Sequence, residues 1–216
     1  MRNKKELKIR NEKNTDYEAT EMIIKEAFWN LYVPGCSEHY LAHILRSHED
    51  FVPELDLVIE ADNKIIGNIM YTKSRLADET GNTKNILTFG PVCIVPEYQR
   101  RGYGKALMEY SFERAAGLGY EAIVIFGSPA NYVARGFKSC KKFNVSVENG
   151  VFPTAMLVKE LKISALSGHK WTYSQSSAFE FDENTAQRYM DNDSRFLRKT
   201  LPAQEEFYIL SNSVIR

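Results

Sequence analysis

The segment from residue 86 to residue 126 constrains the fold of this chain more than any other part of its sequence. An apolar stretch over 86–95 predicts a buried strand, which ends at Pro96. Apolar residues recur at helical spacing from Tyr103 to Gly117, and Ala122–Phe126 is a continuous apolar run typical of a strand buried on both faces. A strand, a helix and a strand in this order predict a parallel pair joined by a right-handed crossover.

The residues before this segment predict an antiparallel part of the same sheet. Alternating apolar and charged residues favour a strand at 7–10, and helices are expected after the cap-type residues 14–16 and after Ser37. A meander follows, with strands expected at 55–60, 65–75 and 86–95 and turns at 61–64 and 78–82. Because the meander is antiparallel and the crossover is parallel, the predicted fold is α/β, with a central mixed sheet flanked by helices.

The C-terminal third of the sequence predicts a closing hairpin and then a segment of different character. The runs at 143–147 and 155–161 are expected to pair with each other. From about residue 164 the chain is polar and rich in serine, with a helix expected at 184–191 and an apolar ending at 207–210. Its aromatic residues are too numerous for a disordered linker, so we expect this extension to pack on the rest of the protein.

Composition narrows the class of protein. Hydrophobic residues make up 44% of the 216 residues, which is enough to bury a core and argues against intrinsic disorder. The 28 Lys and Arg residues balance 28 Asp and Glu residues, so we expect no broad charge-driven binding to nucleic acid or to a membrane. Three cysteines outside any CxxC pair favour a reducing compartment without structural zinc. With no signal peptide and no run of 18 apolar residues, a cytoplasmic location is expected.

The turn at 96–105 carries the clearest chemical signal. The first backbone N–H groups of a helix lack internal partners and attract anions. Gly102 and Gly104 have no Cβ, so a phosphate can approach the backbone closely. Three cations surround the same point: Arg100, Arg101 and Lys105. The turn therefore predicts a pyrophosphate site, and a tight strand-to-helix turn with surface arginines is the alternative.

The spacing of this turn separates it from two other phosphate motifs. A dinucleotide-binding GxGxxG motif requires glycine where Leu107 stands, and the P-loop pattern fails at Gln99 and Ala106. The segment instead resembles the signature of the GNAT superfamily of acetyl-coenzyme A-dependent N-acetyltransferases, V-x-P-x-x-Q/R-x-x-G-x-G/A. The matching residues, with isoleucine in place of valine, are Ile94, Pro96, Gln99, Gly102 and Gly104.

The likeness extends to the order of the segments and covers about residues 6–160. The stretch from Leu118 to Phe137, in which G-x-P-A-x-Y precedes a Gly-Phe pair, resembles one subgroup of the superfamily. The resemblance implies a GNAT domain at 1–163. It also implies a C-terminal extension at 164–216 that packs on the core or on the slot for the acetyl acceptor.

The resemblance further implies which residues bind acetyl-coenzyme A. The backbone of Val92, Cys93 and Ile94 would pair with the pantetheine arm, in a slot where this strand and the next one diverge. The pyrophosphate would be held by the turn: Arg100, Arg101, Gly102, Tyr103, Gly104 and Lys105. Many members carry a cofactor-binding asparagine where this chain has Ile125, and Asn131 is the expected substitute.

A tyrosine in the pattern Y-x-x-x-G-F is the proton donor of the family, and Tyr132 occupies that position here. A phenol with a pKa of about 10 suits a departing thiolate whose pKa is roughly 8.5 by analogy with cysteine. A purely structural aromatic residue is the alternative. The general base stays open among Glu38, Asp56 and Glu60.

The histidines at 39, 43 and 48 invite comparison with a metal site. His39 and His43 share a helix face, but no HExxH-type pattern accompanies them, so no metal is expected. Polar histidines on an amphipathic helix are the simpler interpretation. In this family the same helix flanks the acceptor slot, where the histidines would face the substrate.

Taken together, these features predict an N-acetyltransferase that moves acetyl from acetyl-coenzyme A to a primary amine by direct attack in a ternary complex. The acceptor, a small molecule or a protein, is not identifiable from the sequence. A non-catalytic sensor of acetyl-coenzyme A or coenzyme A is the alternative. No nucleic acid or membrane partner is expected, and a homodimer contact is a second possible role for the extension.

Overall fold

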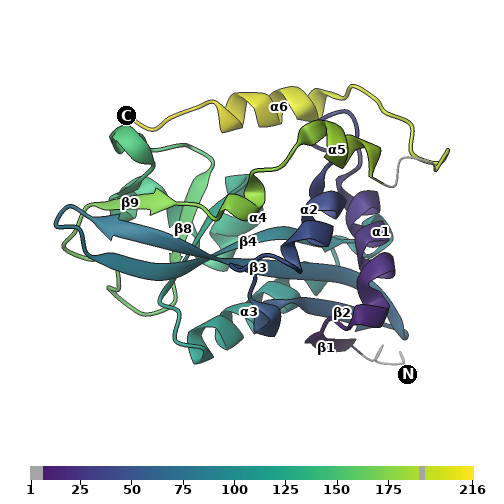
Figure 1. Ribbon diagram of the computed structural model, residues 1–216, viewed down its shortest axis with the longest axis horizontal. Helices are drawn as coiled ribbons and strands as arrows, with labels where there is room; N and C mark the ends of the chain where they lie inside the picture. Colours follow the sequence, from purple (N-terminus) through teal and green to yellow (C-terminus); the bar gives the residue numbers. More distant parts are fainter. Residues whose placement is uncertain (1–6, 190–192) are drawn as a thin grey trace.

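The computed structural model describes residues 7–189 and 193–216 of the chain. Within these residues one mixed sheet is flanked by helices (Figure 1). The strands are β1 (Leu7–Asn11), β2 (Leu57–Ala61), β3 (Lys64–Asp78), β4 (Thr83–Ile94), β5 (Ala122–Phe126), β6 (Lys138–Ser139), β7 (Val145–Ser146), β8 (Met156–Glu160) and β9 (Trp171–Ser174). The helices are α1 (Tyr17–Phe28), α2 (Glu38–Leu45), α3 (Tyr103–Gly117), α4 (Pro129–Tyr132), α5 (Glu183–Arg188) and α6 (Pro202–Ser211).

The sheet runs in the order β1-β2-β3-β4-β5-β8-β6. The pairs β1–β2, β2–β3 and β3–β4 are antiparallel, β5 lies parallel to β4, and β8 is antiparallel to both β5 and β6. The parallel pair, its crossover through α3 and the mixed sheet confirm the prediction from sequence. β9 pairs antiparallel with the end of β3 at Arg75–Asp78 and parallel with β7.

The helices cover both faces of the sheet (Figure 1). Successive side chains of a strand point to opposite faces, and β3 shows how the two layers are built. Met70 packs among buried residues of α1 and α2, whereas Ile69 and Tyr71 pack on the other face with residues of α3. All three side chains are fully buried. The centre of the molecule is therefore β3 and β4, enclosed between α1–α2 and α3.

The predicted closing hairpin is wrong. Met156–Glu160 pairs with β5 and with the two-residue strand Lys138–Ser139, whereas Val145–Ser146 pairs with Trp171–Ser174. After β6 the chain turns away through a 3-10 turn that ends at Asn144, whose φ is 55°. Because β6 already occupies the edge of β8, β7 pairs with the C-terminal strand instead.

The C-terminal extension adds β9 to the sheet, and the chain after β9 lies over the side of the sheet that carries α1 and α2 (Figure 1). Trp29 Nε1 and Asn30 Nδ2 both donate to the carbonyl oxygen of Leu197, at 3.1 and 2.8 Å. α5 begins one residue before the helix expected at 184–191 and ends at Arg188, and residues 190 and 191 of the expected helix lie outside the described part of the chain. The apolar ending at 207–210 belongs to α6. Among the described residues no helix is both long and apolar enough to cross a membrane.

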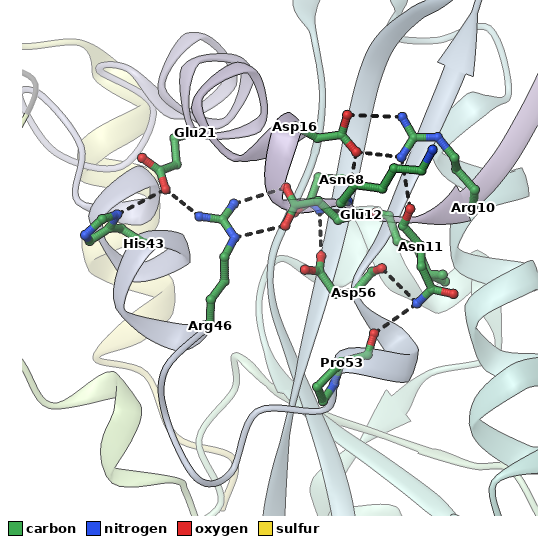
Figure 2. A network of polar contacts seen from close by, with 12 residues as sticks. Arg10, Asn11, Glu12, Asp16, Glu21, His43, Arg46, Pro53, Asp56 and Asn68 are labelled. Atoms are coloured by element: carbon green, nitrogen blue, oxygen red, sulfur yellow. Dashed lines mark hydrogen bonds and ion pairs between the residues drawn. The ribbon is translucent and has the colours of Figure 1, made fainter.

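A network of charged side chains ties α1 and α2 to the strands (Figure 2). Arg46, which follows α2, donates to both carboxylate oxygens of Glu12 at 2.9 and 3.0 Å and also pairs with Glu21 of α1. Next to Glu12 lies the buried carboxyl group of Asp56, which accepts a hydrogen bond from Asn68 Nδ2 at 3.1 Å. Burial and the hydrogen bond with Glu12 raise the pKa of Asp56 far above its usual range, which favours the protonated acid at this position. The network holds the helices that form one wall of the site described next.

Candidate active site

A cavity of about 600 Å³ opens where β4 and β5 diverge. In the described residues the backbone pairing between these two strands consists of one residue pair, Leu87 opposite Ile123. Beyond it, β4 contains a cis peptide bond between Gly90 and Pro91, and both residues line the cavity. The remaining lining comes from α1, α2 and their connection, the turn before α3, α3 itself, the end of β5, α4 and the turn after it, and α6.

Val92, Cys93 and Ile94 present one strand edge to this cavity. Their other edge pairs with residues 67–69 of β3, and the described register of β5 does not reach them. A strand with a free edge can bind an extended ligand through its backbone N–H and C=O groups.

The turn before α3 has the geometry of an anion site. Gly102 caps the helix with a φ of 89°, in the left-handed region that favours glycine. A Cβ added to Gly102 would meet no heavy atom within 4 Å, so the approach to the helix N-terminus is open. Gln99 Nε2 donates to the carbonyl oxygen of Ile94 at 2.9 Å and joins the turn to the strand. Arg100 and Lys105 line the cavity at this point.

The structure brings most of the predicted site residues together. Those that line the cavity are Val92, Cys93, Ile94, Arg100, Gly102, Gly104, Lys105, Asn131 and Tyr132. Arg101 and Tyr103 are outside the lining and pack on Tyr98 instead. The Arg101 guanidinium lies 5.7 Å from the Tyr98 ring centroid, and the Tyr103 ring lies 5.9 Å from it. The roles of all these residues in binding and catalysis remain predictions.

Tyr132 ends α4 and belongs to an aromatic cluster. Its ring centroid lies 5.8 Å from those of Phe89 and Phe137. Burial raises the pKa of the Tyr132 phenol above its ordinary value. The phenol therefore keeps its proton at neutral pH and is a donor rather than a base.

Cys93 lies in the middle of the free strand edge but is not poised for nucleophilic attack. Its side chain is buried, and burial raises the pKa of the thiol to about 12. The reactive form of cysteine is the thiolate, so this thiol is inert at neutral pH.

The three carboxylates considered for the general base lie in different surroundings. Asp56 belongs to the network of Figure 2, and Glu60 pairs with Arg10 at 2.5 Å. Glu38 opens α2 and lines the cavity. Burial raises the pKa of Glu38 to about 7, although the N–H of Ser37 donates to its Oε2 at 3.1 Å. Of the three, Glu38 is the carboxylate that lines the same cavity as Tyr132.

The histidines of α2 and the loop after it do not line the cavity. His39 is buried, with Nε2 3.0 Å from the carbonyl oxygen of Tyr189. His43 Nδ1 lies 2.8 Å from the Tyr189 hydroxyl and 3.2 Å from Glu21. His48 Nδ1 accepts from the N–H of Asp50 at 3.1 Å. In the described parts of the chain no group of three or more His, Cys, Asp or Glu side chains is placed to hold a metal.

Two regions of the lining were not found from the sequence. Phe207 of α6 stacks on Tyr32 with ring centroids 4.4 Å apart, and no motif marks either residue. Arg135 also lines the cavity, and its buried Nε has no hydrogen-bond partner in the part of the chain that the structure describes. The position of Arg135 between Tyr132 and the Gly-Phe pair was the available signal.

Comparison with known sequences relates this chain to acetyltransferases. A sequence model described as the acetyltransferase (GNAT) family matches residues 24–139. The chain is 26% identical over 96 residues to YjhQ, an uncharacterized N-acetyltransferase of Escherichia coli strain K12. That match covers 44% of this chain and 52% of YjhQ, so the chain spans about half the length of the curated relative it matches.

Solved structures show the same architecture. The GNAT family N-acetyltransferase YhbS from Escherichia coli, in complex with CoA, superimposes with a TM-score of 0.71 at 19% identity, over 84% of this chain and 96% of that chain. A GNAT family acetyltransferase from Brucella melitensis, in complex with acetyl-CoA, gives a TM-score of 0.63 at 20% identity, over 81% and 98%. At these identities the likeness establishes the fold.

Proposed function

The chain belongs to the GNAT acetyltransferase family, and on this basis we propose that it moves an acetyl group from acetyl-coenzyme A to a primary amine by direct attack in a ternary complex. One observation carries the proposal. A free strand edge, a helix N-terminus with nearby cations and a partly buried, protonated phenol line a single cavity. A thioester with a diphosphate tail and an acceptor amine require these three elements.

The cofactor end of the cavity is proposed to lie along β4 and the turn before α3. The backbone of Val92–Ile94 pairs with the pantetheine arm, and the turn from Arg100 to Lys105 holds the pyrophosphate, with Asn131 at the rim. The unpaired Nε of Arg135 supports this assignment, because a buried guanidinium N–H without a partner is suited to an anionic or carbonyl group of a ligand.

Tyr132 is proposed to be the proton donor. As the amine nitrogen attacks the thioester carbonyl, a C–N bond forms and the C–S bond breaks. The Tyr132 phenol gives its proton to the departing sulfur, and the proton lost from the new amide nitrogen restores the phenol. Its protonated state at neutral pH supports this role.

The remaining assignments are proposals of the same kind. Residues 1–163 form the acetyltransferase domain, and residues 164–216 form an extension that packs on the acceptor slot, which the stacking of Phe207 on Tyr32 supports. A cytoplasmic location, a homodimer and the absence of nucleic acid partners remain predictions from the sequence.

A non-catalytic sensor of acetyl-coenzyme A is the alternative, and thiol release distinguishes the two. We expect acetyl-coenzyme A to bind in a calorimetric titration, and we expect free thiol to appear faster when a suitable primary amine is added. Binding without accelerated thiol release on any primary amine would favour the sensor.

A further inference from the structure

One wall of the cavity is formed by α1, α2, the connection between them and α6, and this helical wall is mainly apolar. The Phe207 ring stacks on Tyr32 at 4.4 Å, and the Tyr32 ring lies 5.9 Å from that of Phe28. Its apolar lining residues are Ala27, Phe28, Leu31, Tyr32, Leu41 and Phe207. A molecule bound against this wall buries its surface on hydrocarbon and aromatic rings, which favours an apolar body.

The position of Phe207 is held by hydrogen bonds around Asn30, which is 7% exposed. Asn30 Nδ2 donates to the carbonyl oxygen of Leu197 at 2.8 Å, and its Oδ1 accepts from the N–H of Lys199 at 3.0 Å. Gln204 Nε2 donates to the Asn30 carbonyl oxygen at 3.0 Å. α6 is therefore fixed as part of the helical wall.

Charge is divided unequally within the cavity. Its cations are Arg100, Lys105 and Arg135, from the turn before α3, from α3 and from the turn after α4. Among the described lining residues Glu38, on the helical wall, is the one carboxylate. One ammonium group finds a partner there, whereas a second positive group would find cations and no further carboxylate.

Glu38 lines the same cavity as Tyr132, the proposed proton donor, and as Tyr32. Burial raises the pKa of Tyr32, and the negative charge of Glu38 acts in the same direction. The pKa of Glu38 itself is raised to about 7, first by burial and also by the like charge of Glu183. A carboxylate that titrates near neutrality can hold an ammonium group and then take a proton from it.

Resting on the acetyl transfer proposed above, we propose that the helical wall is the acceptor subsite and that it selects a primary amine carried on a small apolar or aromatic body, with Glu38 as the carboxylate that pairs with the ammonium group. Glu38 takes one proton from the ammonium, which leaves the neutral amine as nucleophile. After the C–N bond has formed, the second proton restores Tyr132, and Glu38 releases its proton to solvent. The balance is one ammonium and one thioester converted to one amide, one thiol and one proton.

The volume of the cavity favours a small acceptor. The whole space is about 600 Å³, and the acetyl-pantetheine end of the cofactor must share it with the amine. A lysine side chain presented by a protein, or a polyamine, would also bring polar groups or further positive charge against the helical wall. Burial of those groups without partners is unfavourable.

A panel of amines tests this proposal. The rate of thiol release from acetyl-coenzyme A is measured with methylamine, butylamine, hexylamine and 2-phenylethylamine, and with spermidine and an N-terminally blocked lysine peptide. We expect kcat/KM to rise about fourfold for each added methylene until the subsite is full, in line with the burial of apolar surface. We expect 2-phenylethylamine to exceed spermidine and the peptide by about tenfold or more.

Two variants test whether the helical wall determines the preference among these amines. Glu38→Gln should lower kcat/KM for 2-phenylethylamine by about tenfold or more, with the Kd for acetyl-coenzyme A unchanged. Phe207→Ala should lower kcat/KM for 2-phenylethylamine by about tenfold and leave that for methylamine nearly unchanged, because methylamine does not reach the ring. Glu18→Gln, exposed on α1 and outside the cavity lining, is the matched control and should leave both values unchanged.

The possible failures are distinguishable. Faster turnover of spermidine or of the lysine peptide, or an equal loss on all amines in Phe207→Ala, would overturn the assignment of the subsite and leave acetyl transfer standing. If acetyl-coenzyme A binds but no amine in the panel or beyond it accelerates thiol release, the proposed function itself fails. Because Phe207 is only half-buried, its replacement also tests the subsite if Glu38→Gln does not fold.

Discussion

Gly127 lies directly against the ring of Tyr132. A Cβ added at this glycine would stand 2.6 Å from Tyr132 Cε2, closer than a carbon atom can approach an aromatic ring without displacing it. Gly127 follows β5 and its N–H donates to the carbonyl oxygen of Ala155 at 2.9 Å, so its own position is fixed. The orientation of the proposed proton donor therefore depends on the absence of a side chain at residue 127.

We expect Gly127→Ala to lower the turnover number by about 10- to 100-fold, because displacement of a catalytic group by about 1 Å has effects of that size. Steady-state kinetics with a reactive amine measures the loss. Gly117→Ala is the control, since a Cβ there would meet no heavy atom within 4 Å. Equal activity of the two variants would show that the ring of Tyr132 is not held in the way described.

Gly67 of β3 has a comparable role for the cofactor strand. An added Cβ would lie 2.5 Å from the carbonyl oxygen of Cys93 and 2.4 Å from Ile94 Cδ1. Because the first of these atoms is backbone, Gly67→Ala should shift the strand edge at Val92–Ile94 and raise the Kd for acetyl-coenzyme A about tenfold.

Calorimetry on Gly67→Ala and on the double variant Gly67→Ala/Ile94→Val identifies the cause of that loss. The second substitution removes Ile94 Cδ1 but leaves the contact with the Cys93 carbonyl, so affinity should not return. A wild-type Kd in Gly67→Ala would argue against pairing of the pantetheine arm with this edge.

The cations of the cavity should contribute to cofactor affinity according to their position. Arg100→Ala, Lys105→Ala and Arg135→Ala should each raise the Kd for acetyl-coenzyme A by about tenfold, the size of one charge-assisted hydrogen bond. Arg101→Ala should raise this Kd by less, because the Arg101 guanidinium lies over the ring of Tyr98. Arg114→Ala, at the far end of α3, should have no effect. Losses that do not weaken in high salt would contradict an electrostatic origin.

Asp56 makes the stability of the fold depend on pH. Its pKa is raised in the folded state by burial and by Glu12, so the folded protein holds a proton that the unfolded chain releases above a pH of about 4. The free energy of unfolding should therefore fall as the pH rises above that value. Asp56→Asn keeps the hydrogen bonds of the protonated acid and removes this titration.

Urea unfolding at pH 5.5 and at pH 8.5 measures the effect. Wild-type protein should lose more stability between the two pH values than Asp56→Asn, and the difference should be about 2–4 kcal/mol. Parallel losses in both proteins would show that Asp56 is ionised in the folded state.

Local patterns in the sequence predicted the part of the site built from one continuous segment. The period of apolar residues and the glycines at its ends placed α3 at Tyr103–Gly117, and the apolar run placed β5 at Ala122–Phe126. Because the strand, turn and helix are consecutive, the anion site between them followed from spacing alone. Tyr132 was identified through the resemblance to the family, in which a tyrosine precedes a Gly-Phe pair at this spacing.

The rest of the site depends on contacts between distant segments, which carry no local signal. Phe207 reaches Tyr32 through an extension anchored at Asn30, and the pairing of β7 with β9 was missed for the same reason. The choice among Glu38, Asp56 and Glu60 depends on which carboxylate faces the cavity, and tertiary packing decides this.

The central claim, that Tyr132 donates the proton in acetyl transfer, is tested most directly by the single-turnover rate of Tyr132→Phe with saturating acetyl-coenzyme A and amine. Loss of a general acid lowers the rate by about 100-fold or more. The account predicts a fall of this size with an unchanged Kd for acetyl-coenzyme A, and wild-type values for Tyr208→Phe, whose ring is exposed on α6. A wild-type single-turnover rate in Tyr132→Phe would contradict it.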